Sequence, residues 1–539
     1  MERPIISTTE GEIQGITLTS ILGEKYLAFE GIPYAQSPVG SLRFEKPQPP
    51  SKWSGVRDAS EVREKSLQFK LFGPRPYNIF GDEDCLYLSV YTRAIGIKRP
   101  VIFYIHGGSY VEGCAGVYKP DYFLTSDLVY VSTNYRLGPM GFLNVGHKVS
   151  SGNQGLRDII FALQWVQRNI EAFGGDQNNV TIFGNSIGSS ICHLFTMIPA
   201  AKGLFHKAIL QSGTIFTSKD LLKKDKFENG FKLASLLGMN SDDPVKVIEF
   251  LRTVPAKDLV RFHGSLLPEK VKGILWHYEY GPVFDADYTD DPLIPLPISK
   301  MLKNDSNIPI IIGKTSDEAI IFFTGKFRDD FFASKNAELE DFVRSSLKAD
   351  DPDKVNKIFE DVKRFYLENK PVTKATARNL GHLWSDFLYV NPMRKLVDIR
   401  NKYANAPTYC YNFSYIGNEP TIYQTIKGPQ PLKGVAHADE LSYMFYISFL
   451  KEFEEVESHP QEGTLDRLVI DRFVKLWYNF AATGNPTPFV DDKIVTIKWK
   501  PSSKDCLYYL DMDEKLTMKI DENSRSRSMY EKMKDLILI

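Results

Sequence analysis

The sequence predicts an α/β protein with a central, mostly parallel twisted sheet flanked by helices. Three observations lead to this fold class. Short β-branched runs of strand length recur along the chain and are apolar throughout, as strands buried on both faces are. An amphipathic helix separates two of these runs, which is the pattern of a right-handed parallel crossover. Several of the runs end abruptly in glycine and polar residues, where loops at the carboxyl ends of strands would lie.

The individual elements follow from local pattern. Residues 5–29 alternate β-prone and turn residues and predict edge hairpins, and residues 29–50 hold too many prolines and glycines for a helix. Between residues 155 and 173 apolar positions recur at steps of mostly three and four, which predicts a helix packed on one face. Residues 465–483 predict another helix. Buried strands are predicted at residues 100–106, 128–134, 180–183, 208–211, 308–313 and 409–415.

No internal repeat, low-complexity tract or linker-like stretch divides the chain. We therefore expect one domain over residues 1–539, with helical insertions at roughly 218–300 and 325–405. The second insertion is mostly helical and charged, and we expect it to form a cap over the ligand end of the sheet.

Composition excludes some partners. The chain of 539 residues carries 66 Lys and Arg against 67 Asp and Glu, a formal net charge of -1, so it offers no basic field to nucleic acid. No run of about 18 apolar residues occurs, so no transmembrane segment is expected.

The cellular compartment is predicted from the chain start and the cysteines. The opening MERPIISTTEGEIQG lacks the basic and apolar regions of a signal peptide, although a chain trimmed of such a peptide would look the same. The five cysteines are odd in number and widely spaced, with no C-x-x-C pair, which suits a reducing compartment and argues against a zinc site. We expect a cytoplasmic protein without a metal ion or cofactor.

Residues 180–190, VTIFGNSIGSS, contain the motif that most directly suggests a catalytic residue. A short strand ends at GNSIG, and small apolar residues able to start a helix follow. Strand, sharp turn and helix are the context of a nucleophile elbow, in which the serine, Ser186, occupies a strained backbone position. Side chains at Gly184 and Gly188 would collide with the neighbouring strand or helix. The pentapeptide alone favours a plain glycine-rich turn over a nucleophile, so its meaning depends on the partners of Ser186.

A serine hydroxyl needs a general base to become a nucleophile. Imidazole can accept its proton and return it to the leaving group, and a carboxylate on the other ring nitrogen sets the tautomer. In this fold class the acid and the histidine follow the serine in chain order. Glu318 follows the strand at residues 308–313, and His437 lies in a loop after the strand at 409–415, so both satisfy that order. Each alone could be an ordinary loop residue.

Negative charge on the tetrahedral intermediate calls for preorganised N–H donors. The HGGSY turn at residues 106–110 follows a buried strand and can supply the N–H groups of Gly108 and Ser109. Ile187, directly after the serine, supplies a third. The alternative interpretation of H-G-G is an ordinary turn at a strand exit.

These motifs together resemble a known family. GNSIG with its strand, HGGSY, GKTSDEA and GVAHADEL resemble the type-B carboxylesterases of the α/β-hydrolase superfamily. The resemblance extends, in family order, from the first thirty residues to beyond residue 440 through FEGIPYAQSPVGSLRF, EDCLYLSVY, NYRLGPMGF, GLRDIIFALQWVQRNIEAFGGD and QSG. Among subgroups the chain is most similar to insect α-esterases, intracellular enzymes of ester detoxification and of odorant or lipid-ester turnover.

The resemblance implies roles for particular residues. It implies a catalytic triad of Ser186, Glu318 and His437, with Ser212 as a polar support. It also implies an oxyanion hole formed by Gly108, Ser109 and Ile187, and structural ion pairs of Arg43 with Glu83 and of Arg136 with Asp176.

The sequence departs from the family at several positions. Asn185 stands where Glu or Gln is usual and Ile187 where Ala is usual, so the branched side chain is expected to narrow the acyl side of the gorge. Ser109 replaces a Gly or Ala and keeps its N–H. Ser66 and Met239 stand where the family has disulfide cysteines, which points inside the cell. The segment PRPYNIFGD lacks the tryptophan with which cholinesterases bind a quaternary ammonium, which argues against acetylcholine.

We therefore expect a serine carboxylesterase that cleaves uncharged, medium-sized esters through an acyl-enzyme, acts as a monomer or homodimer, and is phosphorylated by organophosphates at Ser186. The alternative is a catalytically weak relative that binds ligands or partners. Such relatives typically lose the serine or histidine, whereas both are present in this chain. A narrower alternative, juvenile hormone esterase, usually carries Gln at the position of Asn185.

Overall fold

The computed structural model describes residues 3–70, 78–217, 228–262, 279–302, 307–347, 351–425, 430–453, 459–491, 493–521 and 524–537. The chain divides into two units. The first comprises Met1–Ile209, Ser218–Ser306 and Ala481–Gly484, and the second comprises Leu210–Thr217, Asn307–Phe480 and Asn485–Ile539. The expectation of one domain over residues 1–539 stays a prediction. Residues 218–227 and 263–278 of the first predicted insertion lie outside the described residues, as do residues 71–77, where PRPYNIFGD begins.

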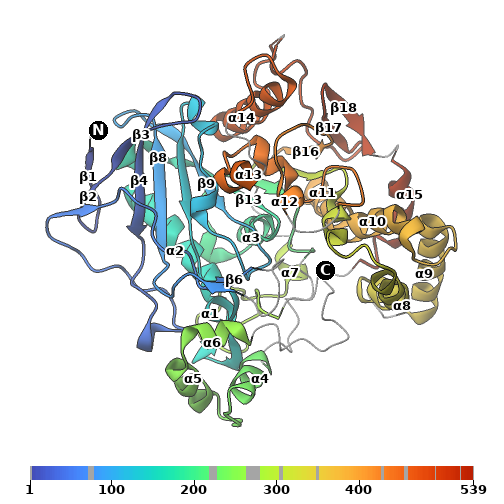
Figure 1. Ribbon diagram of the computed structural model, residues 1–539, viewed down its shortest axis with the longest axis horizontal. Helices are drawn as coiled ribbons and strands as arrows, with labels where there is room; N and C mark the ends of the chain where they lie inside the picture. Colours follow the sequence, from blue (N-terminus) through green and yellow to red (C-terminus); the bar gives the residue numbers. More distant parts are fainter. Residues whose placement is uncertain are drawn as a thin grey trace. The chain divides into compact units, whose positions relative to one another are not determined.

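The first unit is built on a mixed sheet. Its described strands follow the order β13-β9-β10-β8-β4-β3, and neighbouring strands lie side by side in Figure 1. β9, β10 and β13 pair in parallel, whereas β8, β4 and β3 are antiparallel to their neighbours. The apolar runs predicted to be buried strands are buried. The bounds are β3 (Ile16–Thr19), β4 (Lys25–Pro33), β8 (Tyr87–Thr92), β9 (Arg99–Ile105), β10 (Val129–Thr133) and β13 (Gly175–Asn185). β14 (Lys207–Gln211) lies where the chain passes into the second unit.

Helix α2 (Gln154–Asn169) confirms the helical periodicity predicted after residue 155. It buries Leu156, Ile159 and Leu163 completely, because steps of three and four residues return to the same face. The other described helices of the first unit are α1 (Gly138–Phe142), α3 (Ile187–Phe195), α4 (Glu228–Leu236), α5 (Pro244–Thr253), α6 (Ala256–Arg261) and α7 (Ile298–Met301). Its minor strands are β1 (Ile5–Ser7), β2 (Glu12–Gln14), β5 (Val56–Asp58), β6 (Gln68–Phe69), β7 (Ile79–Phe80), β11 (Asn144–His147) and β12 (Ser150–Ser151).

The second unit has strands in the order β15-β16-β17-β18, namely β15 (Ile310–Thr315), β16 (Thr408–Phe413), β17 (Tyr508–Met512) and β18 (Leu516–Ile520). β15, β16 and β17 pair in parallel and β18 is antiparallel to β17. β15 and β16 confirm two predicted strands. β17 and β18 were not predicted, because β18 has no continuous apolar run: two of its five residues are polar and only its first residue is buried.

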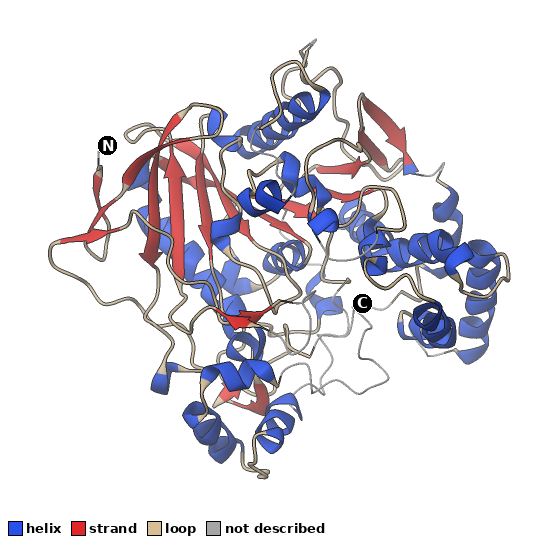
Figure 2. Ribbon diagram, in the orientation of Figure 1, coloured by secondary structure: helices blue, strands red, loops and turns tan. Residues whose placement is uncertain are grey.

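The helices between β15 and β16 confirm the helical character predicted for residues 325–405. They are α8 (Asp329–Ser345), α9 (Pro352–Leu367), α10 (Ala377–Ser385) and α11 (Asn391–Tyr403), and the π-helical segment Asp386–Val390 joins the last two. Figure 2 shows these helices gathered together without an intervening strand. The remaining helices are α12 (Ile422–Thr425), α13 (Ser448–Phe453), α14 (Leu465–Thr483) and α15 (Arg525–Met533).

One of the two predicted ion pairs is confirmed and the other is wrong. Arg43 and Glu83 pair at 2.6 Å. Arg136 pairs with Asp158 of α2 at 2.7 Å, not with Asp176. The reason is that the Asp158 carboxylate accepts from both the backbone N–H and the guanidinium of Arg136 in a fully buried site, whereas Asp176 accepts from the N–H of Asn178 in its own turn.

All five cysteines lie in the described part of the chain, and all are free. Ser66, at the position of a family cysteine, donates its hydroxyl hydrogen to the carbonyl of Tyr135 at 2.6 Å. Within the described ranges, no helix combines the length and the apolarity needed to cross a bilayer.

Candidate active site

Ser186 joins β13 to α3 in the first unit. Its backbone angles are φ 57° and ψ −125°, which L-residues rarely adopt and which mark a strained turn. A Cβ at Gly184 would lie 2.3 Å from the carbonyl carbon of Gly188, and a Cβ at Gly188 would lie 2.1 Å from the carbonyl oxygen of Ile105 in β9. These contacts confirm that both glycines of the predicted elbow are needed for close packing.

The backbone N–H of Ile187 lies in the first turn of α3. The first N–H groups of a helix have no partner within the helix, and the helix dipole places partial positive charge there. Ile187 itself is almost completely buried. This N–H is therefore suited to stabilise negative charge that develops beside Ser186.

The HGGSY turn lies beside the elbow in the same unit. A Cβ at Gly107 would come within 3.1 Å of the Cβ of Ser186. Gly108 has φ 108°, and its carbonyl accepts from the N–H groups of Val111 and Glu112 at 3.0 Å each. Ser109 also has a positive φ, of 57°. The structure thus places the turn predicted to hold oxyanion donors next to the candidate nucleophile.

The buried side chain of His106 contacts this turn and the neighbouring Tyr135. Its ring stacks on Tyr135 with centroids 4.4 Å apart, and Nδ1 donates to the carbonyl of Gly107 at 2.9 Å. Burial lowers the pKa of His106 to about 4, so the ring is neutral near neutral pH. Its role is to hold the turn.

The second unit contains the candidate acid and base. Glu318 begins the 3-10 turn after β15 and is completely buried. Its Oε2 lies 2.6 Å from Nδ1 of His437. Its Oε1 accepts from the hydroxyl of Ser212 at 2.6 Å and from the N–H of Thr315 at 2.8 Å. The backbone N–H of His437 also donates to the carbonyl of Glu318 at 3.1 Å, so backbone and side chain both fix the pair.

This geometry determines the chemistry that His437 can perform. With Nδ1–H donating to the carboxylate, Nε2 carries the lone pair and can act as a general base. Burial opposes ionisation of Glu318, but His437, Ser212 and the N–H of Thr315 stabilise the anion and hold its pKa below the usual value overall. The pair is therefore suited to stabilise an imidazolium.

Glu440 is a buried neighbour that the sequence argument missed. Its Oε1 lies 3.3 Å from the hydroxyl oxygen of Ser212, which links it to Glu318. Burial, together with the charge of Glu318, raises the pKa of Glu440 well above its usual value, which favours the neutral form of Glu440 beside the Glu318 anion. The acidic pair Asp439-Glu440, which follows His437 after one alanine in GVAHADEL, was the available signal.

Asp439, the other member of that pair, shapes the histidine loop. Its carboxylate accepts from the N–H of Ala436 at 2.8 Å, one residue before His437. Burial raises the pKa of Asp439 to about 7. Within the described residues, no three His, Cys, Asp or Glu side chains gather closely enough to hold a metal ion. The expectation of no cofactor stays a prediction.

The mixed sheet, the strained serine elbow and the acid–base pair after later strands are the features of an α/β hydrolase. The chain belongs to the carboxylesterase family, whose sequence profile matches residues 2–531.

Known proteins agree with this assignment. Esterase E4 of Myzus persicae is 34% identical over 93% of this chain and 89% of its own length, and esterase B1 of Culex pipiens is 30% identical over 90% and 89%. The crystal structure of juvenile hormone esterase from Manduca sexta, with OTFP covalently attached, superposes with a TM-score of 0.84 at 26% identity over 99% of both chains. The protein is accordingly a carboxylic ester hydrolase with the α/β-hydrolase fold.

Proposed function

We propose that the protein hydrolyses uncharged, medium-sized carboxylic esters with Ser186 as nucleophile, His437 as general base and Glu318 as the acid that orients and charges the histidine. The observation that carries this proposal is the 2.6 Å contact between Nδ1 of His437 and the buried carboxylate of Glu318. Such a contact leaves Nε2 as a base, and the family supplies the serine mechanism.

In the proposed reaction Ser186 Oγ attacks the ester carbonyl while His437 Nε2 takes its proton. The N–H groups of Gly108, Ser109 and Ile187 stabilise the oxyanion of the tetrahedral intermediate. Collapse of the intermediate breaks the bond to the alcohol oxygen, which takes the proton from His437 and leaves an acyl-enzyme. Water, deprotonated by His437, then releases the carboxylic acid and restores the Ser186 hydroxyl.

The substrate class follows from composition and from the departures already noted. Uncharged esters are favoured because the chain is nearly neutral and PRPYNIFGD lacks the tryptophan of choline sites. The branched Ile187 and the side chain of Ser109 support a restricted acyl side. Within this class we propose xenobiotic, odorant or lipid-type esters, and detoxification as the setting. The likeness to juvenile hormone esterase supports the fold, and Asn185 does not favour its hormone as substrate.

We propose a cytoplasmic location, and the five free cysteines support a reducing compartment. The protein is expected to act as a monomer or a homodimer. Size-exclusion chromatography with light scattering measures the molar mass and so distinguishes a monomer from a homodimer.

The decisive experiment compares kcat/KM on 4-nitrophenyl butyrate for the wild type, Ser186→Ala and the exposed-loop control Ser51→Ala. We expect Ser186→Ala to lose at least about 10⁴-fold in kcat/KM and Ser51→Ala to lose nothing. Wild-type turnover no higher than that of Ser186→Ala would instead favour the ligand-binding alternative.

Organophosphates should phosphorylate Ser186, because the oxyanion donors also stabilise a phosphoryl oxygen. Intact mass spectrometry should show one covalent adduct per chain, absent from Ser186→Ala. An adduct that persists in the variant would place the reactive group elsewhere.

A further inference from the structure

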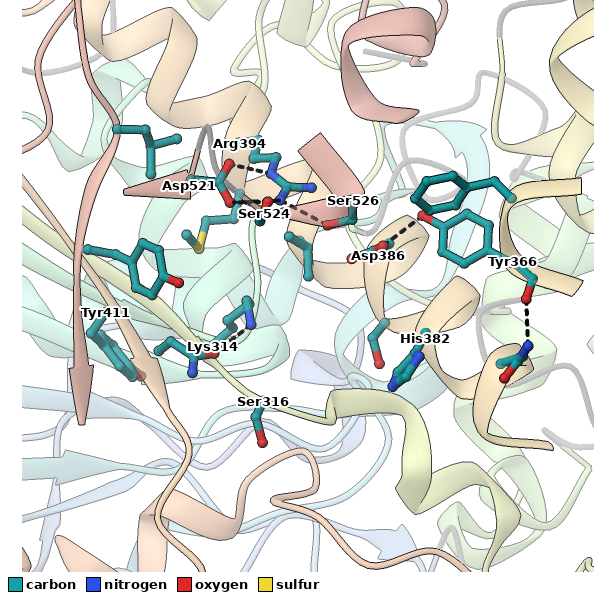
Figure 3. Close-up of a pocket in the computed structure, with 18 residues that line it drawn as sticks. Lys314, Ser316, Tyr366, His382, Asp386, Arg394, Tyr411, Asp521, Ser524 and Ser526 are labelled. Atoms are coloured by element: carbon teal, nitrogen blue, oxygen red, sulfur yellow. Dashed lines mark hydrogen bonds and ion pairs between the residues drawn. The ribbon is translucent and has the colours of Figure 1, made fainter. Parts of the chain in front are cut away.

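The second unit contains a cavity of about 420 Å³, partly open to solvent, that the esterase mechanism does not use (Figure 3). Its walls come from the exits of β15 and β16, from α9, α10 and α11, and from the chain around β17 and α15. Its volume falls in the range of small-molecule sites. None of the described residues that line it is a predicted catalytic or oxyanion residue. The exposed ring of His382 is one of its lining groups.

One pair of charges in the cavity is already matched. Arg394 and Asp521 form two parallel contacts of 2.7 Å, the bidentate geometry of a strong ion pair. Ser524 and Ser526 accept further hydrogen bonds from the same guanidinium nitrogen at 2.9 Å and 3.0 Å. This pair therefore contributes little net charge toward a ligand.

Lys314 is the cation that remains. Its Nζ donates to Asn412 Oδ1 at 2.6 Å and to the carbonyl of Thr315 at 3.3 Å, and both acceptors are neutral. Among the described residues no carboxylate lies within ion-pair distance of this nitrogen. An ammonium has three hydrogens to donate, and an unmatched charge inside a protein is costly. Burial accordingly lowers the pKa of Lys314.

The rest of the lining separates into one polar and one apolar part. Asp386 accepts from the hydroxyl of Tyr366 at 2.7 Å; burial raises the pKa of Asp386, while Arg394, Tyr366 and Lys314 act to lower it. Apolar side chains complete the wall: Phe365, Val390, Met393 and Leu507. The cavity therefore offers an apolar surface and one ammonium whose direct hydrogen-bond acceptors are neutral, although the charges of Glu318, Asp386 and Asp521 act on it from a distance.

We propose that this cavity binds a small amphipathic monocarboxylate, with its carboxylate on the Lys314 ammonium and its hydrocarbon chain against Met393 and Leu507. A single ammonium with a hydrogen left to donate suits a monoanion, whereas a phosphate dianion would bring a second charge without a partner. A cationic ligand would meet the ammonium of Lys314. The carboxylic acid that an ester hydrolase releases belongs to this chemical class, so the inference extends the carboxylesterase activity.

Isothermal titration calorimetry with octanoate tests the site in the full-length Ser186→Ala protein, which removes turnover. Adding Lys314→Met should weaken octanoate binding at least about tenfold, as expected for loss of a charge-assisted hydrogen bond. The exposed-lysine control Lys300→Met should leave the dissociation constant unchanged. Octan-1-ol, which lacks the charge, should bind with an affinity that does not depend on Lys314.

A second variant, at a different part of the cavity, shows whether weaker binding reflects the cavity itself or misfolding of Lys314→Met. Met393→Trp fills the apolar part of the cavity, leaves Lys314 in place and should weaken octanoate binding similarly, with thermal unfolding used to verify that each variant is folded. Octanoate binding that both variants leave at the parent affinity would overturn the proposal, as would the absence of saturable binding. These results would leave the catalytic proposal intact, because that proposal is tested on Ser186 and ester turnover.

Discussion

Glu318 shows how one side chain can be determined by its surroundings. Its two oxygens accept from a histidine ring, a serine hydroxyl and a backbone N–H in a completely buried site. Each donor stabilises the anion, and together they outweigh burial, which alone would favour protonation. These contacts therefore stabilise the ionised carboxylate of Glu318, which its proposed role requires.

Replacing this charge without changing the shape should expose its role. We expect Glu318→Gln to lower kcat about 10²- to 10⁴-fold with a small change in KM, because the imidazolium loses its counter-charge and the ring its tautomer. Ser212→Ala should cost less, about tenfold, because it removes one of three donors. Initial rates on 4-nitrophenyl butyrate measure both effects, and Glu340→Gln on an exposed helix face serves as control. Activity of Glu318→Gln within twofold of wild type would contradict the proposed triad.

Asp439 should make stability fall with rising pH. Its pKa is about 7 in the folded protein against 3.8 ordinarily, so between these values the folded state holds a proton that the unfolded state has lost. Stability from this group is complete below the lower value and is lost as pH rises toward the upper one. From pH 5 to pH 8 we therefore expect Asp439→Asn to gain roughly 2–3 kcal/mol relative to wild type. Urea unfolding measures this difference, and parallel pH curves would refute it.

At the scale of elements, the elbow depends on the approach of α3 to β9. Gly188→Ala would place a methyl group 2.1 Å from the carbonyl oxygen of Ile105, where backbone must move. We expect a loss of at least about 3 kcal/mol in unfolding free energy, in the range of severe overpacking. Gly203→Ala is the control, because its Cβ would meet nothing within 4 Å and only its positive φ would cost about 1 kcal/mol. Equal losses at the two positions would show that packing at the elbow is not the cause.

The pairing of Arg136 can be tested with the two aspartates that compete for it. Asp158→Asn leaves a buried guanidinium without its counter-charge and should cost about 3–5 kcal/mol. Asp176→Asn should cost less than about 1 kcal/mol, because Asp176 is partly exposed and its hydrogen bond is to the backbone N–H of Asn178, two residues along the chain. Denaturant unfolding of the two variants provides the comparison, and the reverse order would restore the pairing first predicted from the family resemblance.

At the scale of the whole molecule, the fold holds without disulfides. Cys85, Cys192 and Cys410 are buried, and burial raises their pKa, that of Cys85 to about 12. Native protein should therefore react with iodoacetamide first at Cys506. Cys114 should react more slowly, because burial raises the pKa of its thiol as well. All five should react in denaturant. Peptide mass spectrometry measures the order, and a reductant should leave the melting temperature unchanged. Rapid labelling of Cys192 in the native protein would contradict this burial.

Sequence pattern predicted most of the central architecture because the buried strands are strongly apolar. The runs that became β9, β10, β13 and β15 have few polar residues to make them ambiguous, and the period of α2 is clear. β17 and β18 form a hairpin across residues 513–515, but three of the five residues of β18 are exposed, so β18 lacks the continuous apolar run that marks the other strands. Of the two ion pairs predicted, Arg43 with Glu83 is confirmed, whereas the partner of Arg136 could not be chosen correctly because several carboxylates are chemically equivalent in the sequence.

By itself the sequence determined the class of fold, the serine elbow and the identities of the candidate acid and base, because these depend on periodicity, on glycine at close approaches and on motif order. Tertiary structure alone decided which side chains meet. It pairs Arg136 with Asp158, places Glu440 beside Ser212, and gives the ammonium of Lys314 a neutral acceptor in Asn412. The physical reason is that hydrogen bonds and ion pairs act only over a few ångströms, and distances between residues far apart in the chain are set by packing of the whole core.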